Sequence, residues 1–293
     1  MLLPLQLLID GLITGALYAL ITLGFAVIYN GTRIFHLAHG GVFAFGAYML
    51  WTFNVWLGLN IFLACLAAII CSAAFGALIE ILVYRKLRRR RSSGDATVVA
   101  SLGVIILIQA MLALVYGTDS RVLHENALAI YSLDGIVVTR LHVVDAVVAI
   151  LIFPLLHYFV SYTKQGRAMR ALADNPDLVP FFGVDRDRLY IVIFALGSAL
   201  AGLAGGLIAM DSGALPEMGF EIMFIALTAV IIGGVGYLPG AAAGGIMVGV
   251  LQNFSLWPFS ANWRDVVVFG VLIAFLLVRP QGVFGSLLVV RRA

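Results

Sequence analysis

The sequence predicts an all-α, polytopic membrane protein, and three observations carry that prediction. Hydrophobic residues fill 62% of the 293 positions, only 11% are charged, and the mean hydropathy is +1.07. A soluble domain is about 45–50% apolar and about 25% charged, so a soluble core could not bury this much apolar surface. The apolar positions also gather into runs close to the about 20 residues that cross a bilayer. We therefore expect a transmembrane helical bundle forming a single domain over residues 1–293.

Apolar segments separated by turn residues are the candidate spans. The first one exceeds the about 7–15 residues of a signal-peptide core and has no basic start, so it indicates a retained helix. Segments 35–53 and 222–256 are rich in glycine, and such stretches are broken or re-entrant only where they are buried or line a cavity. We expect eight to ten crossings from these segments: 5–29, 35–53, 57–84, 97–116, 141–160, 189–210, 222–238, 240–256 and 263–279.

Lysine and arginine predict the orientation. Six of the 18 lie in Arg85–Arg91, five lie between Lys164 and Arg188, and three lie at the C-terminal end. The positive-inside rule places all three regions in the cytoplasm and the N-terminus outside. The Arg85–Arg91 run directly follows a long apolar helix, so it is typical of an anchor on anionic lipid heads and not of a nucleic-acid site.

Groups that would support catalysis are missing from the sequence. The chain has two lysines, Lys86 and Lys164, and neither follows a glycine-rich loop, so it contains no phosphate-binding loop. Cys65 and Cys71 lie six residues apart on one helix, roughly 9 Å between Cα atoms, which exceeds the about 7 Å limit for a disulfide. We expect no catalytic residue, no metal site and no cofactor. The near absence of Asp and Glu deep in the spans also argues against ion coupling.

Two glycine-rich stretches, one in each half of the chain, are candidates for a translocation path. Paired interruptions of this kind mark the binding site in transporters. Small residues at this spacing also let helices approach closely, which is the commoner use. For the two histidines, lining a path and satisfying the backbone of a broken helix are equally open. The path candidates are His36, His39, Gly40, Gly41, Gly233, Gly234 and Gly236.

One polar insert, "RAMRALADNPDLVPFFGVDRDR" from Arg167 to Arg188, interrupts the apolar chain on its cytoplasmic side. Arg167, Arg170, Ala171 and Asp174 recur at the spacing of one helix face. We expect Asn175 to cap a second short helix with Pro176 at its first position, and Gly183 to close it. The tip is too apolar for water, which indicates a docking surface for a cytoplasmic partner. Its apolar residues are Leu178, Val179, Phe181 and Phe182.

The stretch "GRAMRALADNPDLVPFFGVD" resembles the cytoplasmic coupling loop of LivH-type permeases in the branched-chain amino-acid ABC-importer family. "GLITGALYALITLGFAVIYNGTRIFHLAHGGVFAFGAY", "AVIIGGVGYLPGAAAGG" and "RPQGVFG" resemble further segments of that family, in the same order. Two departures stand out. His36-Leu37 replaces the family's usual Asn, which puts a polar role there in doubt, and Pro180 should break the loop's second helix.

The resemblance implies the fold of an ABC-importer permease in the bacterial inner membrane, moving branched-chain or related amino acids, or small amides such as urea. The implied partners are cytoplasmic ATP-binding subunits, a second permease subunit and a periplasmic or lipid-tethered substrate-binding protein docking on loops 117–140 and 211–221. A secondary carrier or channel acting alone is the alternative. The coupling loop, about 161–189, would contact the ATPase through Gly166, Arg167, Met169, Arg170, Ala171, Asp174, Asn175 and Gly183.

Overall fold

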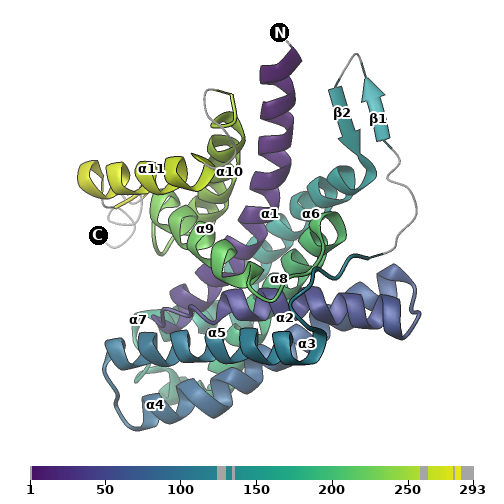
Figure 1. The fold of residues 1–293 in the computed structure, drawn as a ribbon. Coiled ribbons are helices and arrows are strands. Elements are labelled where there is room, and N and C mark those ends of the chain that lie inside the picture. Colours follow the sequence, from purple (N-terminus) through teal and green to yellow (C-terminus); the bar gives the residue numbers. More distant parts are fainter. Residues whose placement is uncertain (1, 124–129, 134–135, 258–262, 280, 285–293) are drawn as a thin grey trace. The chain divides into compact units, whose positions relative to one another are not determined.

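The computed structural model describes residues 2–123, 130–133, 136–257, 263–279 and 281–284, and most of them are helical (Figure 1). A helix covers most of every predicted apolar segment, so the all-α prediction is confirmed. The α-helices are α1 (Leu2–Thr32), α2 (His39–Trp51), α3 (Ile61–Ile79), α4 (Arg85–Arg89), α5 (Gly94–Tyr116), α6 (Arg140–Tyr162), α7 (Lys164–Asp174), α8 (Arg186–Ser212), α9 (Met218–Gly233), α10 (Leu238–Phe254) and α11 (Arg264–Val278).

Three short helices of other types join them. The π-helices η1 (Thr52–Trp56) and η2 (Glu80–Tyr84) continue α2 and α3, and the 3₁₀ helix η3 (Val179–Phe182) follows α7. The predicted second segment is shorter than expected, because residues 33–38 form no helix and α2 begins at His39. The glycines of this segment, Gly40, Gly41 and Gly46, lie within the continuous helix formed by α2 and η1, so the expected interruption does not fall among them.

Five helical stretches among the described residues are long and apolar enough to cross a membrane: Leu3–Thr32, Ile61–Arg89, Gly94–Tyr116, Arg140–Tyr162 and Arg186–Ser212. Three shorter apolar helices lie within Met218–Gly233, Leu238–Phe254 and Val266–Val278. Large apolar side chains such as Leu114 and Ile150 are 84% and 70% exposed. Exposed leucine and isoleucine on apolar helices of this length face lipid. The chain is a multi-pass membrane protein.

The chain divides into two compact units. Unit 1 comprises Met1–Leu23, His124–Pro154 and Phe224–Ala293, and unit 2 comprises Gly24–Leu123 and Leu155–Met223. One boundary falls inside α6 at Pro154, where the missing N–H leaves a helical carbonyl without its usual donor. The prediction of one permease domain over the whole chain stays a prediction.

Small residues form the core of unit 2, where α2, α3 and α8 meet. A methyl group added at Gly76 would overlap Ser198 of α8, and one added at Gly202 would overlap Ser72 of α3. Gly46 of α2 lies against Gly202 at a distance that also leaves no room for a side chain. Small residues at a crossing let two helices approach closely in a bilayer, as the sequence predicted.

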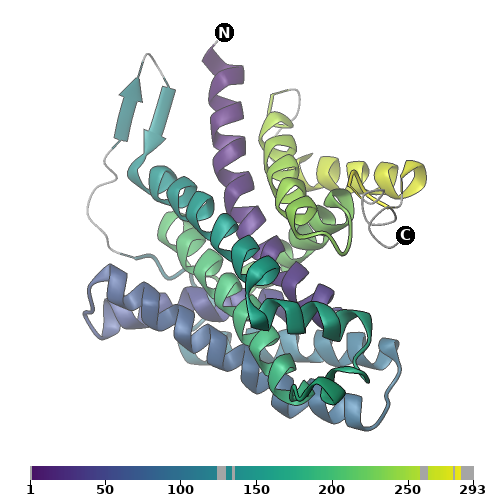
Figure 2. The ribbon, with the colours of Figure 1, turned by 180° about the vertical axis from the view of Figure 1, so that it is seen from behind.

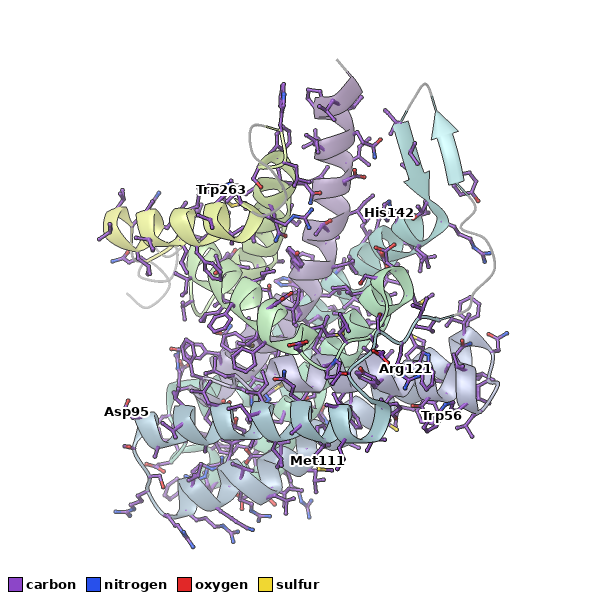
Figure 3. All side chains as sticks on the ribbon, in the orientation of Figure 1. Trp56, Asp95, Met111, Arg121, His142 and Trp263 are labelled. Atoms are coloured by element: carbon purple, nitrogen blue, oxygen red, sulfur yellow. The ribbon has the colours of Figure 1, made fainter. Side chains whose placement is uncertain are left out.

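The ends of unit 2 differ in chemistry. Figure 3 places Trp56 and Arg121 at one end and Asp95, near the start of α5, at the other. Trp56 stacks on Tyr116 with ring centroids 5.5 Å apart, and Arg121 lies over Trp51. Aromatic side chains of this kind sit at membrane–water interfaces. They agree with the predicted outer side, while the arginine-rich end agrees with the cytoplasmic side.

Unit 1 contains the N-terminal half of α1, which packs on α10. A methyl group at Gly249 would overlap Gly15, and the Tyr18 hydroxyl donates a buried hydrogen bond of 2.6 Å to Gln252 Oε1. The predicted loop 117–140 also holds an antiparallel hairpin, β1 (Ile130–Leu133) and β2 (Ile136–Thr139). The sequence analysis missed this hairpin, whose edge at Val137 is bonded by the Gln6 amide.

Candidate coupling surface and translocation segments

The coupling loop begins with α7, which folds back onto the end of α6 after a one-residue break at Thr163 (Figure 2). Thr163 is the N-cap of α7, and its hydroxyl accepts a 3.0 Å hydrogen bond from the Gly166 N–H. A side chain at Gly166 would overlap the carbonyl oxygens of Phe159 and Val160. Glycine therefore permits the close approach of α7 to the last turn of α6.

Helix α7 is strongly amphipathic. Gly166, Met169 and Leu172 are buried. The predicted polar face is exposed on the same helix: Arg167, Arg170, Ala171 and Asp174. An amphipathic helix beyond the membrane segments buries one face on its own protein and leaves the other for water or a partner.

The arginines of α7 satisfy the last carbonyls of α6. Arg167 Nη1 donates to the Tyr162 carbonyl at 2.9 Å, and Arg170 Nη2 donates to the Ser161 carbonyl at 3.1 Å. Arg170 Nη1 also bonds the Val160 carbonyl. The last carbonyls of a helix have no intrahelical donor, so these guanidinium groups fix the angle between α6 and α7.

The second half of the loop differs from the prediction. Asn175 ends α7 and does not begin a new helix, because its side chain accepts a 3.1 Å hydrogen bond from the Asp177 N–H and forms a local turn. The helix that follows is the single 3₁₀ turn η3. Pro180 lies in its first turn, where a backbone N–H has no intrahelical acceptor, so the missing N–H of proline costs no helical hydrogen bond. Gly183 closes it in the left-handed conformation with φ of 73°, as predicted.

The tip of the loop exposes an apolar surface. Phe181 and Phe182 are 85% and 80% exposed, and Leu178 is 52% exposed, while Val179 is buried beneath them. The charged residues around them place this tip at the arginine-rich end of unit 2. These three large apolar side chains form the exposed patch that the sequence predicts to be a docking surface.

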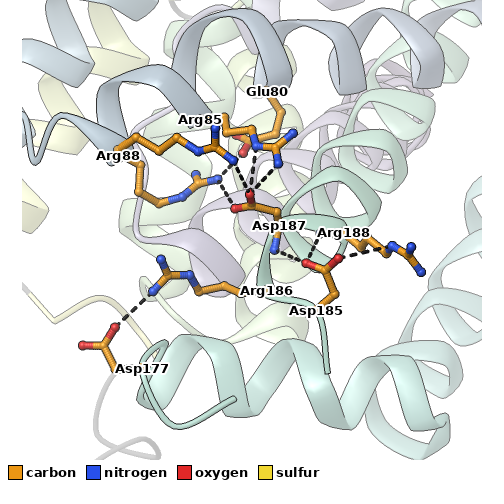
Figure 4. A network of polar contacts seen from close by, with 9 residues as sticks. Glu80, Arg85, Arg88, Asp177, Asp185, Arg186, Asp187 and Arg188 are labelled. Carbon is orange, nitrogen blue, oxygen red and sulfur yellow. Dashed lines mark hydrogen bonds and ion pairs between the residues drawn. The ribbon is translucent and has the colours of Figure 1, made fainter. Parts of the chain in front are cut away.

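An arginine clasp holds the start of α8, directly after the loop. We use this name for Arg85, Arg88 and Arg89 around Asp187; Figure 4 labels Arg85 and Arg88 beside Asp187. Arg85 Nη2 lies 2.6 Å from Asp187 Oδ2, Arg89 lies 3.2 Å from it, and Arg88 lies 3.7 Å from Oδ1. The loop itself joins this region through a 3.0 Å ion pair between Arg186 and Asp177.

The clasp extends to a buried acid, Glu80. Arg88 Nη2 lies 2.6 Å from Glu80 Oε1, and the Arg88 guanidinium stacks 3.6 Å from the centroid of the Tyr190 ring. Glu80 is fully buried, and the ion pair through Oε1 compensates part of the cost of burying its carboxylate, while Glu80 Oε2 has no hydrogen-bond partner. The interpretation of the basic run as a lipid anchor is therefore incomplete. Lys86, Arg90 and Arg91 are exposed, but the three clasp arginines bind acids of this chain.

The first predicted path segment, His36–Gly41, is buried in unit 2. His36 Nδ1 lies 2.7 Å from the Tyr84 hydroxyl, which is 2.9 Å from Ser101 Oγ. Ser101 Oγ also accepts a 2.9 Å hydrogen bond from the Ala38 N–H. These contacts hold the non-helical residues in front of α2. Both histidines have no exposed surface, and the His36 side chain bonds the Tyr84 hydroxyl and no backbone group, so both predicted uses of the histidines stay predictions.

Close helix contacts surround the neighbouring residues of this segment. The His39 ring lies against Gly24 of α1, where an added methyl would be 2.9 Å from His39 Cε1. A methyl at Gly40 would overlap the Gly219 carbonyl at the start of α9, and one at Gly41 would lie 2.8 Å from Ile108 Cδ1. Gly40 and Gly41 thus serve tight packing within unit 2.

The second path segment, Gly233–Gly236, belongs to unit 1 and connects α9 to α10. Gly234 and Gly236 have φ of 105° and 95°, a region that favours glycine. Gly233 and Gly240 are in backbone contact, because a methyl at either would overlap the carbonyl of the other. These glycines make the sharp connection between two short apolar helices.

The sequence analysis did not identify four residues that organise unit 2: Glu80, Tyr84, Ser101 and Asp187. The sequence assigns no partner to Glu80, and Asp187 is only one of the charges of the polar insert. Two signals pointed to Asp187: it lies in the first turn of a long apolar helix, and the chain carries a run of arginines that needs anions. Nothing in the sequence indicates that Tyr84 contacts His36.

Comparison with known proteins agrees with this architecture. Residues 7–276 match the sequence model of a family described as the permease component of the branched-chain amino acid transport system. The chain belongs to this family. The high-affinity branched-chain amino acid transport system permease protein BraD of Pseudomonas aeruginosa is 33% identical over 96% of this chain and 95% of its own. LivH of Escherichia coli K12 is 29% identical over the same shares.

One solved structure has the same fold as the permease. It is PsaBC from Streptococcus pneumoniae in complex with a Fab, with a TM-score of 0.53, 12% identity and coverage of 95% of this chain and 94% of that chain. The permease is thus a transport subunit of an ABC importer and not an enzyme, and ATP is used by partner subunits. The family implies ATP-binding subunits and a second permease as partners. Among the described residues no cluster of His, Cys, Asp or Glu could hold a metal ion.

Proposed function

We propose that this permease moves branched-chain or related amino acids across a bacterial inner membrane, in a complex with two ATP-binding subunits and a second permease. Relatives that match nearly the whole chain are named for branched-chain amino acid transport. A separate substrate-binding protein would select the substrate and deliver it to the outer loops, and the permease would need no cofactor of its own.

The coupling loop is the proposed contact for the ATP-binding subunit. The observation that carries this assignment is the exposed tip of Leu178, Phe181 and Phe182, which follows the capped amphipathic helix α7. Arg167 and Arg170 hold α7 on α6, and Gly166 permits that contact. The partner would therefore meet Ala171, Asp174 and the phenyl rings. Asn175 and Gly183 shape the two turns that present them.

The outer loops are the proposed contact for the substrate-binding protein. Asp119 precedes the short bridge between Arg121 and Ala214, which joins the first residues of loop 117–140 to loop 211–221 within unit 2. Asp211 and Glu217 lie three residues before and three residues after Ala214, the other residue of that bridge. Two further acids of these loops, Glu125 and Asp134, lie outside the described residues. His36, His39, Gly40 and Gly41 of unit 2, and Gly233, Gly234 and Gly236 of unit 1, remain proposed path residues, each within its own unit.

Uptake by the reconstituted complex tests the function. The permease, its partner permease, the ATP-binding subunits and the binding protein are placed in liposomes, and ATP-dependent uptake of labelled leucine and labelled urea is measured. We expect leucine uptake that requires ATP. Urea uptake without leucine uptake would change the substrate class, and uptake by this chain alone without ATP would contradict the assignment.

The loop is tested by a double variant, Phe181→Ser with Phe182→Ser, in the same liposomes. Each buried phenyl ring contributes about 1.5–3 kcal/mol, so we expect binding of the ATP-binding subunit to weaken at least about tenfold while the chain still inserts and folds. Leu57→Ser is the matched control, because Leu57 is 61% exposed near the aromatic end of unit 2. Equal effects of the two changes would contradict the docking role.

A further inference from the structure

The π-helix η2 carries two buried polar side chains that belong to two different networks. Glu80 and Tyr84 are 0% and 1% exposed. Glu80 joins the arginine clasp, and Tyr84 joins the hydrogen bonds around His36. Segments of π-helix are rare and occur frequently at functional sites. Here the five residues of η2 connect a charged cluster to a buried one within unit 2.

The first network joins α4 to the start of α8, which directly follows the coupling loop. Asp187 lies in the first turn of α8, four residues after Gly183, and its N–H is capped by Asp185 at 2.9 Å. Three arginines of the η2–α4 segment converge on its carboxylate. Any displacement of the loop that moves the start of α8 must therefore move α4 with it or break three ion pairs.

The second network fixes the residues in front of α2. Tyr84 contacts His36 and donates to Ser101, and Ser101 accepts from the Ala38 N–H. The Tyr84 ring also packs on Phe194 of α8, with centroids 5.1 Å apart. A shift of Tyr84 would disturb the only side-chain hydrogen bonds that the described structure gives to His36 and to the Ala38 backbone.

We propose that η2 transmits the position of the coupling loop to the His36–Gly41 segment, with Asp187, Glu80 and Tyr84 as positioning residues. This inference rests on the proposed function, in which an ATP-binding subunit moves the loop. A segment with i→i+5 bonds has an alternative α-helical register, and a change between the two would turn Tyr84 relative to Glu80. Elements with two discrete arrangements of this kind convert small displacements into a switch.

Uptake per ATP hydrolysed in the complete complex tests the relay. Tyr84→Phe removes one hydroxyl and keeps the ring, and Asp187→Asn removes one charge. We expect each to lower the ratio of leucine taken up to ATP hydrolysed at least about fivefold. Because both changes interrupt one chain of contacts, the double variant should be no worse than the more severe single variant. Effects that multiply, or a normal ratio in Tyr84→Phe, would overturn the relay.

Tyr116→Phe is the matched control. Its hydroxyl is bonded to Thr52 at 2.7 Å in the same unit, and it contacts neither network. The ratio should stay within about twofold of the wild type. A wild-type complex without ATP-dependent uptake would refute the proposed function itself, whereas wild-type uptake with unchanged variants would refute the relay alone.

Hydrogen exchange provides a readout independent of transport. In the complete complex, Asp187→Asn should raise amide exchange at residues 34–39 at least about fivefold, although no atom of Asp187 contacts them. A purely local role for Asp187 would confine the change to α4 and the start of α8. That result would overturn the proposal.

Discussion

Two groups of arginines on the predicted cytoplasmic side use the same functional group in different ways. The clasp arginines bind carboxylates, with Arg85 and Arg89 sharing Asp187 and Arg88 reaching Glu80. The loop arginines bind backbone carbonyls, with Arg167 and Arg170 closing the last turn of α6. The first group joins segments about 100 residues apart in the sequence, and the second fixes one local angle.

The difference shows what each group depends on. Ion pairs depend on partner charges and on salt, whereas hydrogen bonds to carbonyls depend on the two backbones staying close together. The clasp is therefore sensitive to the removal of one anion, Asp187. The loop is sensitive to any side chain that separates α7 from α6, which makes Gly166 its vulnerable position.

The largest expected effect is that of Gly166→Val. The added side chain would overlap the Phe159 and Val160 carbonyls, so α7 could no longer sit on α6 and Arg170 would lose its acceptors. Overpacking against backbone costs at least about 1–3 kcal/mol, and here it also breaks the N-cap at Thr163. We expect a lower thermal midpoint in detergent and less folded protein in size-exclusion chromatography.

Gly183→Ala is the matched control for this change. Gly183 also lies in the loop, but nothing lies within 4 Å of an added methyl, and only its φ of 73° is unfavourable. The cost should be about 1 kcal/mol. If Gly183→Ala were as destabilising as Gly166→Val, close contact with α6 would not be what distinguishes Gly166.

Asp187→Ala is expected to have the next largest effect. It leaves three arginines without their shared carboxylate, but the pair is partly exposed, with 27% of the Asp187 side chain and 32% of the Arg85 side chain accessible. We therefore expect about 1–3 kcal/mol, between the values for surface and buried ion pairs. Chemical denaturation in detergent measures it.

Asp185→Ala serves as the comparison for Asp187→Ala, because it removes the N-cap of α8 and leaves the clasp carboxylate in place. A lost N-cap costs about 1 kcal/mol. If Asp185→Ala and Asp187→Ala lowered the free energy of unfolding equally, the ion pairs of the three arginines would contribute no more to stability than one helix cap.

The same two regions show which structural features could be predicted from the sequence and which could not. Composition and helix spacing sufficed for the apolar helices, for α7 and for Gly183, because these depend on local patterns. Long-range pairs carry no such local signal. Asp187 meets Arg85 from about 100 positions away, and Tyr84 meets His36 across 48. The prediction that Asn175 caps a second helix is wrong, because its side chain accepts a hydrogen bond from the Asp177 N–H and forms a local turn instead.

A smaller effect is expected from salt, which should weaken the contribution of the clasp arginines to stability more than that of the loop arginines. At 1 M salt the Debye length falls to about 3 Å, so the clasp ion pairs weaken, while hydrogen bonds to carbonyls change little. We expect the destabilisation caused by Arg85→Ala to shrink by at least about half between 0.05 and 1 M NaCl. The destabilisation caused by Arg170→Ala should stay within about 0.3 kcal/mol. An equal salt dependence would contradict the division into ion pairs and carbonyl bonds.

The smallest expected effect concerns the cations of the basic run that lie outside both groups. Lys86, Arg90 and Arg91 are exposed and form no ion pair with any described residue. Substituting Lys86 and Arg90 with Ser should change the free energy of unfolding by less than about 0.5 kcal/mol, because isolated surface charges contribute little. The same double variant should bind anionic vesicles more weakly, since each cation near an anionic leaflet contributes about 1 kcal/mol. Thermal unfolding and vesicle flotation of one preparation measure both quantities. A large loss of stability would mean that these cations belong to the clasp, and unchanged flotation would mean that the basic run exists for the clasp alone.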